Sequence, residues 1–224
     1  MSNDANANLV FLSNVRISFP HLLDPQVQKN DQGIETKVFN CDFILEPNDP
    51  GFAKFMSIYQ AMAQEKWKEN AQAAMQRIQS DRKTRCYAAG EERVNSKTFQ
   101  VLNGYAGKVS LTARSNRQPQ IIRPDGTPCD PANTMELRAV GSKIYAGCRV
   151  NAVVKPWLQQ NTNGIGVRCD LIAVQFHADD QSFESAPADV SNMFGAVAGG
   201  APAPSAPAPQ MPAAPFPGMP SFLQ

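Results

Sequence analysis

Alternation of apolar and polar residues along 143–155 constrains the fold more than any other feature of this sequence. The even-numbered positions from Ile144 to Val154 are apolar, whereas the odd-numbered ones include Tyr145, Arg149 and Lys155. This is the period of a half-buried β-strand. A second apolar stretch, 165–176, follows the polar, turn-forming residues 159–164. The pattern predicts two long strands joined as a β-hairpin.

Three further segments are predicted to be strands. Residues 9–19 are apolar and β-branched, and Pro20 is expected to end that strand. Residues 36–45 and 107–114 each place apolar side chains at alternate positions, so one face of each strand should pack inward. A short extended piece, 119–122, precedes a Pro-Asp-Gly turn.

A helix is predicted to begin at Asn48-Asp49-Pro50. Asp or Asn followed by Pro suits the N-cap and the first helical position. Large apolar residues then recur at spacings of three and four from Phe52 to Ile78, with no Pro or Gly between them. We expect one long helix whose Met and aromatic stripe packs on the core, followed by a loop over 81–103.

The predicted order is strand, strand, long helix, strand, strand, strand. It indicates a mainly β protein, and the fold expected is an OB-fold, a five-stranded Greek-key barrel with a long helix inserted after the second strand. The barrel domain should span residues 1–178. Residues 179–224 should form a disordered tail, first acidic and then rich in Ala and Pro, because they carry too little apolar surface to order.

Charge is unevenly distributed along the chain. The net charge is +1, yet the stretch from Arg77 to Arg168 holds 15 basic and 6 acidic residues, a net charge of +9, and no Lys or Arg follows it. Such an excess suits a polyanionic partner, although an ordinary solvated face has the same composition. Charge alone therefore leaves both interpretations open.

Several classes of function are disfavoured. Five widely spaced cysteines without a Cys-x-x-Cys pair argue against zinc and fit a reducing cytoplasm. Asp42, Glu46 and Asp49 resemble a nuclease metal site, but a strand end and a helix cap also explain them. His21 and His177 lack a neighbouring nucleophile, and no phosphate-binding loop occurs. We expect no catalytic residue, metal or cofactor, and no contact with a membrane.

Two ingredients for binding single-stranded DNA occur together. Binding without sequence readout needs cations along the phosphates and flat side chains under the bases. Both interleave along 145–155, and cations line the outward face of 107–114. Trp157 has two interpretations, because an aromatic beside a turn either stacks a base or covers the core. The predicted DNA contacts are Arg85, Tyr87, Tyr105, Lys108, Thr112, Arg114, Arg117, Arg123, Tyr145, Arg149, Lys155 and Trp157.

Four fragments, taken in order, resemble a family of phage proteins. They are Phe19-Pro20-His21-Leu22, Gln118-Pro119-Gln120-Ile121-Ile122, the segment 144–150 (IYAGCRV), and Gly164-Ile165-Gly166-Val167 with Asp170-Leu171 and Val174-Gln175. That family, once catalogued as a domain of unknown function, comprises OB-fold single-stranded-DNA-binding proteins of tailed phages. The resemblance extends over residues 9–178.

The resemblance implies sequence-independent binding and protection of single-stranded DNA during phage DNA replication or recombination, without catalysis. The expected location is the cytoplasm of the infected bacterial host. The expected partners are single-stranded DNA, phage replication proteins bound through the C-terminal tail, and further copies of the chain along the same strand. The alternative is a non-enzymatic OB-fold scaffold of a phage replication or assembly complex, because the fold alone does not decide function.

The acidic part of the tail adds one expectation. Four acidic residues between Asp179 and Asp189 are tethered close to the basic stretch. Tethering gives them an effective concentration on the order of mM. They are therefore expected to compete weakly with DNA for Arg114, Arg149 or Lys155.

Overall fold

The computed structural model describes residues 8–29, 33, 35–162 and 164–183. One compact unit, Met1–Ser185, contains the helices and strands of the described residues. The other unit, Ala186–Gln224, makes up most of the predicted tail and lies outside the described residues. The elements are β1 (Val10–Lys29), β2 (Glu35–Leu45), α1 (Pro50–Trp67), the 3₁₀ turn η1 (Lys68–Asn70), α2 (Ala71–Ser80), β3 (Tyr87–Ala89), the 3₁₀ turn η2 (Gly90–Glu92), β4 (Val109–Ser115), β5 (Gln120–Ile122), α3 (Thr134–Gly141), β6 (Arg149–Asn161) and β7 (Gly164–Ala178).

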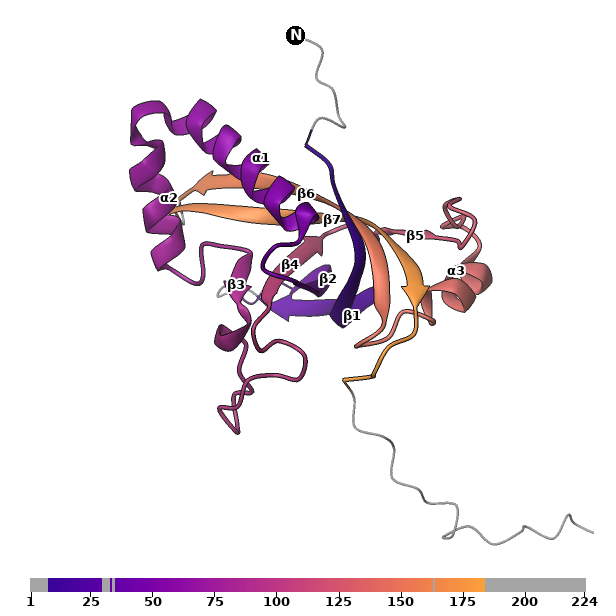
Figure 1. The fold of residues 1–224 in the computed structure, drawn as a ribbon. Coiled ribbons are helices and arrows are strands. Elements are labelled where there is room, and N and C mark those ends of the chain that lie inside the picture. The colour runs from indigo at the N-terminus through magenta and orange to yellow at the C-terminus, as the bar shows by residue number, and fades with distance from the viewer. Residues whose placement is uncertain (1–7, 30–32, 34, 163, 184–224) are drawn as a thin grey trace, which may run out of the picture. The chain divides into compact units, whose positions relative to one another are not determined.

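Five strands close into a barrel (Figure 1). β2 pairs with β1 and β4, and β6 pairs with β1 and β7, all antiparallel. A parallel pairing of β4 with β7, at Arg114 and Asp170, completes the ring. The short strands β3 and β5 add to β4 and β7. The prediction of a five-stranded barrel is therefore confirmed.

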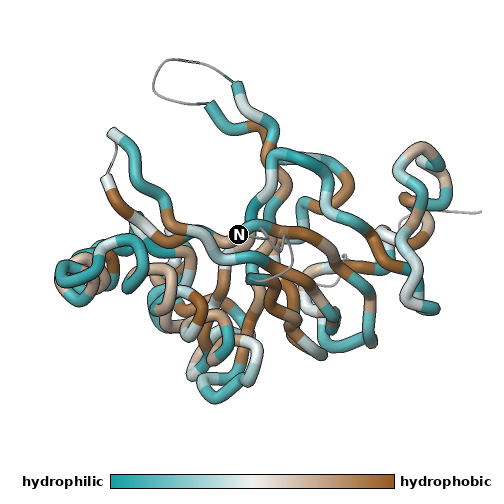
Figure 2. The backbone as a smooth tube through the Cα atoms, turned by 90° about the horizontal axis from the view of Figure 1, so that it is seen from above, coloured by the Kyte–Doolittle hydropathy of each residue, from teal (hydrophilic) through white to brown (hydrophobic). Residues whose placement is uncertain are grey.

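Apolar side chains fill the barrel and the space beneath the helices. Phe43 and Leu111, from neighbouring strands, are fully buried, and burial of each such side chain contributes roughly 1.5 to 3 kcal/mol. All five cysteines are buried and free, so no disulfide contributes. Figure 2 shows the hydrophobic stretches gathered in the body of the domain and hydrophilic ones on the projecting loops.

Pro20 does not end the first strand. β1 continues to Lys29, and its register against β2 shifts between Ser18 and His21. Phe19 there has a φ of 50°. A β-bulge of this kind leaves a residue unpaired, which is where a strand tolerates proline. The strand was predicted too short because proline ends a strand only where a ladder hydrogen bond is needed.

The helix begins as predicted but does not continue unbroken. Asp49 caps α1, accepting a hydrogen bond from the Phe52 amide at 3.0 Å, and Pro50 is its first residue. The 3₁₀ turn at 68–70 then interrupts the run, with Lys68 at a φ of 49°. α1 therefore packs against β6 and α2 against β7 (Figure 1). Tertiary packing of two faces overrides the continuous helical pattern.

Both strands of the β6–β7 hairpin extend further at the tip than predicted, and at the base β6 begins later whereas β7 ends later. Residues 159–161 belong to β6, and Asn161 pairs with Gly164, so the six-residue loop expected at 159–164 was wrong. Polar residues suit a ribbon that extends away from the barrel into water. At the base β6 begins only at Arg149. The helix α3, capped by Asn133 through the Glu136 amide at 3.2 Å, was not expected.

No helix in the described part of the chain is long and apolar enough to cross a membrane.

Candidate nucleic-acid interface

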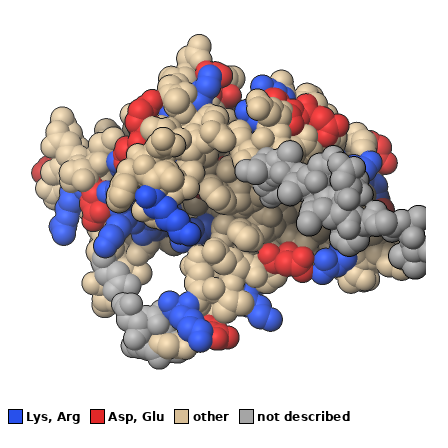
Figure 3. Space-filling view, turned by 90° about the horizontal axis from the view of Figure 1, so that it is seen from below, with Lys and Arg blue, Asp and Glu red and all other residues tan. Residues whose placement is uncertain are grey.

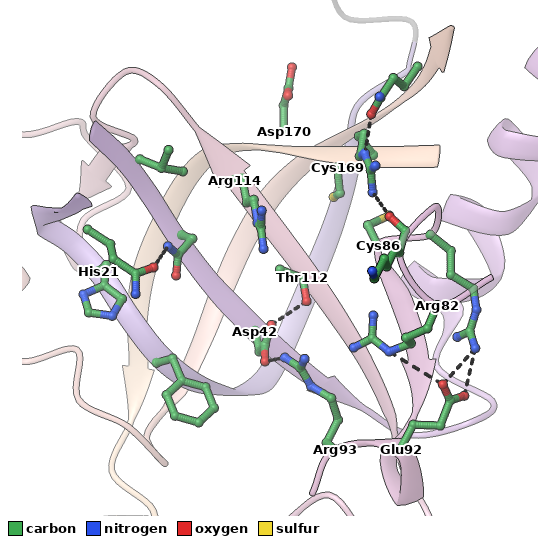
Figure 4. Close-up of a pocket in the computed structure, with 18 of the residues that line it drawn as sticks. His21, Asp42, Arg82, Cys86, Glu92, Arg93, Thr112, Arg114, Cys169 and Asp170 are labelled. Atoms are coloured by element: carbon green, nitrogen blue, oxygen red, sulfur yellow. Dashed lines mark hydrogen bonds and ion pairs between the residues drawn. The ribbon is translucent and has the colours of Figure 1, made fainter. Parts of the chain in front are cut away.

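A groove of about 950 Å³ crosses the barrel where β4 and β7 meet. β1 and β2 form one side, and the outer part of the β6–β7 hairpin with the segment 82–102 forms the other (Figure 4). The lining residues are Phe19, His21, Gln26, Val38, Asn40, Asp42, Arg82, Lys83, Arg85, Cys86, Glu92, Arg93, Val94, Leu102, Thr112, Arg114, Asn116, Trp157, Gln159, Arg168, Cys169 and Asp170. The face seen in Figure 3 shows basic side chains gathered around a hollow.

Arg114, Arg168 and Lys83 are the groove cations that form no ion pair with a described carboxylate. Within the described ranges, neither guanidinium has a carboxylate within 4.0 Å. Arg168 instead donates to the Gln159 amide oxygen at 2.6 Å and to the Lys83 carbonyl at 2.9 Å. Burial lowers the pKa of Arg168, and the nearby charge of Arg114 lowers it further. An anion between these two groups would relieve their repulsion.

The other arginines of the groove are neutralised locally. Arg85 and Arg82 both pair with Glu92, at 2.8 and 3.6 Å. Arg93 pairs with Asp42, which is 3% exposed (Figure 4). Their charges are partly used within the protein, so they contribute less to the attraction of a polyanion than Arg114 and Arg168 do.

Asp42 organises the floor of the groove. In addition to Arg93, its carboxylate accepts hydrogen bonds from the Thr112 hydroxyl at 2.6 Å and from the Tyr105 hydroxyl at 3.1 Å. A buried carboxylate requires such partners, because leaving it unpaired costs several kcal/mol. These three partners give Asp42 a structural role, the interpretation favoured by its position at a strand end. No group of three potential metal ligands occurs among the described residues.

Two aromatic side chains are exposed along the groove. Trp157, on β6, is 39% exposed, and its indole N–H donates to Asp170 at 2.7 Å, which fixes the orientation of the ring. Its cross-strand partner is Arg168. Phe19, at the bulge in β1, is 50% exposed on the opposite side. Burial raises the pKa of Asp170, whereas the hydrogen bond from Trp157 lowers it.

A second cavity, of about 670 Å³, meets the groove at Phe19, His21 and Leu102, which line both. Its further residues come from β1, the segment 95–105, the turn before β6 and the chain after β7. They are Ser18, Pro20, Asn95, Asn103, Tyr105, Ile144, Tyr145, Ala146 and Phe183.

The structure separates the predicted DNA contacts into three groups. Four line the groove: Arg85, Thr112, Arg114 and Trp157. Two line the second cavity: Tyr105 and Tyr145. Six lie outside both: Tyr87, Lys108, Arg117, Arg123, Arg149 and Lys155.

Tyr87 and Tyr105 were predicted to contact DNA, and the structure buries both. Tyr87 lies in β3, packs its ring against Phe52 at 6.0 Å and donates to Gln79 at 2.8 Å. Tyr105 is 1% exposed, because its hydroxyl reaches the buried Asp42. Neither ring offers a free face to a base.

Three of the predicted cations are engaged by carboxylates at other places on the domain. Lys108 pairs with Glu46, and Arg123 pairs with Glu136, each at 2.5 Å. Arg149 pairs with Asp180 at 2.8 Å. These pairs explain the positions of the cations without DNA.

Arg168, Arg82, Lys83, Arg93 and Phe19 line the groove but were not predicted as contacts. The alternation of β7 already placed Arg168 on a polar face, so a signal for it existed. The others lie in loops or at a bulge, where position depends on the tertiary fold. Sequence periodicity carries no information about such positions.

The sequence and the fold were compared with known protein families and solved structures. A family of phage proteins described as Enterobacter phage Enc34, ssDNA-binding protein, matches residues 8–200. The chain belongs to this family. Membership in the Enc34 ssDNA-binding family confirms the resemblance found in the sequence fragments.

Relatives and solved structures agree with the Enc34 family assignment. The protein p50 of Acyrthosiphon pisum secondary endosymbiont phage 1 is 29% identical over 174 residues, 77% of this chain and 84% of that protein. The single-stranded DNA-binding protein from bacteriophage Enc34 in complex with ssDNA is 21% identical, with a TM-score of 0.59 over 80% of this chain and 90% of that one. A second structure of that protein is 20% identical, with a TM-score of 0.57 over 84% of this chain and 90% of that one. The predicted OB-fold is confirmed.

Proposed function

We propose that this protein binds single-stranded DNA in the groove, without reading its sequence, and protects it during phage DNA replication or recombination. The observation that carries the proposal is the cluster of Arg114, Arg168 and Trp157. Two arginines that pair with no described carboxylate line the groove together with an exposed indole, and one of them, Arg168, is the cross-strand neighbour of Trp157. Cations for phosphates and a ring for a base are the two requirements of such binding.

The arrangement of the groove on the barrel supports the same function. OB-folds bind oligonucleotides on the face of their second and third strands, between the loops of two hairpins. Here those strands are β2 and β4, which contribute Asn40, Asp42, Thr112 and Arg114 to the lining. The structure of the Enc34 protein in complex with ssDNA, which shares the fold, also supports this proposal.

The proposed role is binding without catalysis, in the cytoplasm of the infected host. The groove acids Asp42 and Glu92 are held by arginines and Asp170 by Trp157, so their chemistry is explained by packing and orientation. Phage replication proteins and further copies of this chain stay predicted partners. Arg117 and Lys155, outside both cavities, stay predicted contacts.

A salt-titrated binding measurement with fluorescent oligo-dT tests the proposal. The logarithm of the binding constant should fall linearly with the logarithm of salt concentration, with a slope of about −0.7 per phosphate neutralised. The affinity should also increase with oligomer length. A protein that acts only as a scaffold would bind no length of oligo-dT, and that result would refute the proposal.

A further inference from the structure

Phe19, one of the three residues that line both cavities, has an unfavourable backbone conformation. The bulge in β1 turns Phe19 out of the pleat, with its φ of 50° and half of its surface exposed. A left-handed backbone is unfavourable for a residue with a Cβ, and an exposed aromatic ring gains little from burial. Strain at an exposed aromatic position indicates a role in binding rather than in stability.

The linings of the two cavities differ in chemistry. The groove contains six Lys or Arg side chains and three acids, whereas the described residues that line the second cavity include no Lys, Arg, Asp or Glu. Its surfaces are aromatic, with amide groups from Asn95 and Asn103. Such a cavity suits an uncharged, flat group that forms hydrogen bonds at its edge. A nucleobase has these properties, and a phosphate does not.

The wall formed by Phe183 is fixed to the barrel. The Arg16 guanidinium lies 4.2 Å from the centre of the Phe183 ring, in a cation–π contact. The Phe183 amide donates to the Ala146 carbonyl at 3.0 Å. A Cβ at position 104 would collide with the ring, so Gly104 leaves the space that Phe183 occupies.

The chain between β7 and Phe183 is also anchored. Asp180 pairs with Arg149 at 2.8 Å and with Arg16 at 3.6 Å. The Tyr145 hydroxyl donates to the Asp180 carbonyl at 2.8 Å. Gly147, with a φ of 109°, has no room for a side chain beside Gln181. Residues 179–183 are therefore an ordered part of the domain, and they place Phe183 in the wall of the second cavity, next to the Tyr145 that they contact.

We propose that the second cavity is a base-binding subsite for the strand that lies in the groove. The strand passes Phe19, and one of its bases enters beside Tyr145 and Phe183 while the phosphates stay on the groove side. A free nucleotide is a poorer occupant, since its phosphate would find no cation in this cavity. The inference rests on the proposed function, because the base is delivered by the same strand.

The test is a ladder of oligo-dT lengths measured by fluorescence anisotropy with three proteins. The wild-type affinity should show an increment at the length that reaches the second cavity. Phe183→Ala should abolish this increment, a loss of about five-fold or more for one base stack, and leave the shortest binding oligomers unaffected. Trp157→Ala, which changes only the groove, should weaken binding at every length.

Phe183→Ala could also weaken the packing of residues 179–183. Phe183→Leu serves as the second variant, because it keeps an apolar side chain there but removes the flat ring. A dT oligomer with one 5-iododeoxyuridine supplies an independent readout. Photo-crosslinks to Tyr145, Phe183 or Phe19 should form when the label is at one end of the oligomer and not when it is at the other. Wild-type affinity of both Phe183 variants at all lengths, or equal loss at all lengths, would overturn the subsite. Failure of the wild type to bind any length would instead refute the proposed function.

Discussion

Arg114 pairs with Asp170, two residues from Arg168, where the parallel pairing of β4 and β7 closes the barrel, and the charge of Arg114 adds to burial in lowering the pKa of Arg168. Two like charges without carboxylate partners are unfavourable in the free protein. A phosphate between them turns this repulsion into two attractive interactions. We therefore expect this pair to be the main determinant of the path proposed for the DNA backbone.

Replacing either arginine by alanine should weaken binding of oligo-dT and make the binding less sensitive to salt. Each variant should reduce the magnitude of the log–log salt slope by about 0.7, the contribution of one phosphate. Lys54→Ala on α1 removes the same charge from an exposed position outside the groove, and serves as the control. Equal losses in Lys54→Ala and Arg114→Ala would mean that only total charge matters.

Trp157→Ala should weaken binding by about 1 to 3 kcal/mol, as loss of one stacking platform does. The indole is partly exposed and held by Asp170, so the barrel should keep its thermal stability. Phe11→Ala removes an aromatic ring of similar exposure from β1, outside the groove. Anisotropy measurements that give the two variants the same affinity would exclude stacking on Trp157.

Asp170→Asn should tighten binding at pH 7 by less than about five-fold, because interactions between partly exposed charges are worth under about 1 kcal/mol. Burial already raises the pKa of Asp170, and a DNA phosphate nearby would raise it further. Binding is then coupled to proton uptake, so wild-type affinity increases as pH falls. Binding isotherms at several pH values should show a weaker dependence in the variant, which keeps an acceptor for Trp157.

Asp42→Ala should lower the free energy of unfolding by about 3 kcal/mol, measured by urea denaturation. It leaves Arg93 and the buried Tyr105 hydroxyl without their partner. Glu46→Ala breaks the Lys108 pair at a position that is 61% exposed, and should cost under about 1 kcal/mol. Similar values for the two variants would show that the Asp42 cluster is not a stabilising element.

The carboxylate of Asp180 should stabilise the domain without competing for the groove. A hydrogen bond from the Gln181 amide and the charges of Arg16 and Arg149 lower the pKa of Asp180. A lowered pKa stabilises the fold above the unfolded value near 3.9 and ceases to do so as pH falls through the folded value. Asp180→Asn should therefore reduce Tm at pH 7 but not near pH 2.

The same variant tests the expected competition between tail acids and DNA. Arg149 and Arg16, the partners of Asp180, lie outside the groove. Asp180→Asn should not tighten the affinity for oligo-dT at low salt, and a tighter affinity would instead support competition between Asp180 and DNA. Glu184 and Asp189 lie outside the described residues.

Local patterns in the sequence predicted what depends on local chemistry. The cap at Asp49 and the inward parity of Val150, Ala152 and Val154 follow from hydrogen bonding and strand period, and the structure has both. The break at Lys68 and the continuation of β1 past Pro20 do not, because packing against other strands decides them. Such choices are made by the tertiary fold.

The register of one hairpin explains the largest omission from the predicted contacts. A loop over 159–164 would place Gly166 opposite Trp157, whereas the observed turn places Arg168 there. A shift of two residues in the register leaves each side chain on the same face of the sheet, so the polarity pattern of β7 could not distinguish the two registers. The proximity of Arg168 to Arg114 then depends on β4, which is distant in sequence.

The closure of the barrel and the path proposed for DNA coincide. Among the described residues, β4 and β7 pair only at Arg114 and Asp170, whereas the other neighbours in the ring share longer ladders. The β4–β7 pairing is therefore the shortest ladder in the barrel, and separating these two strands would move Arg114 away from Arg168. A polyanion that bridges both arginines would hold β4 and β7 together. The barrel should therefore open less readily in the protein with bound DNA than in the free protein.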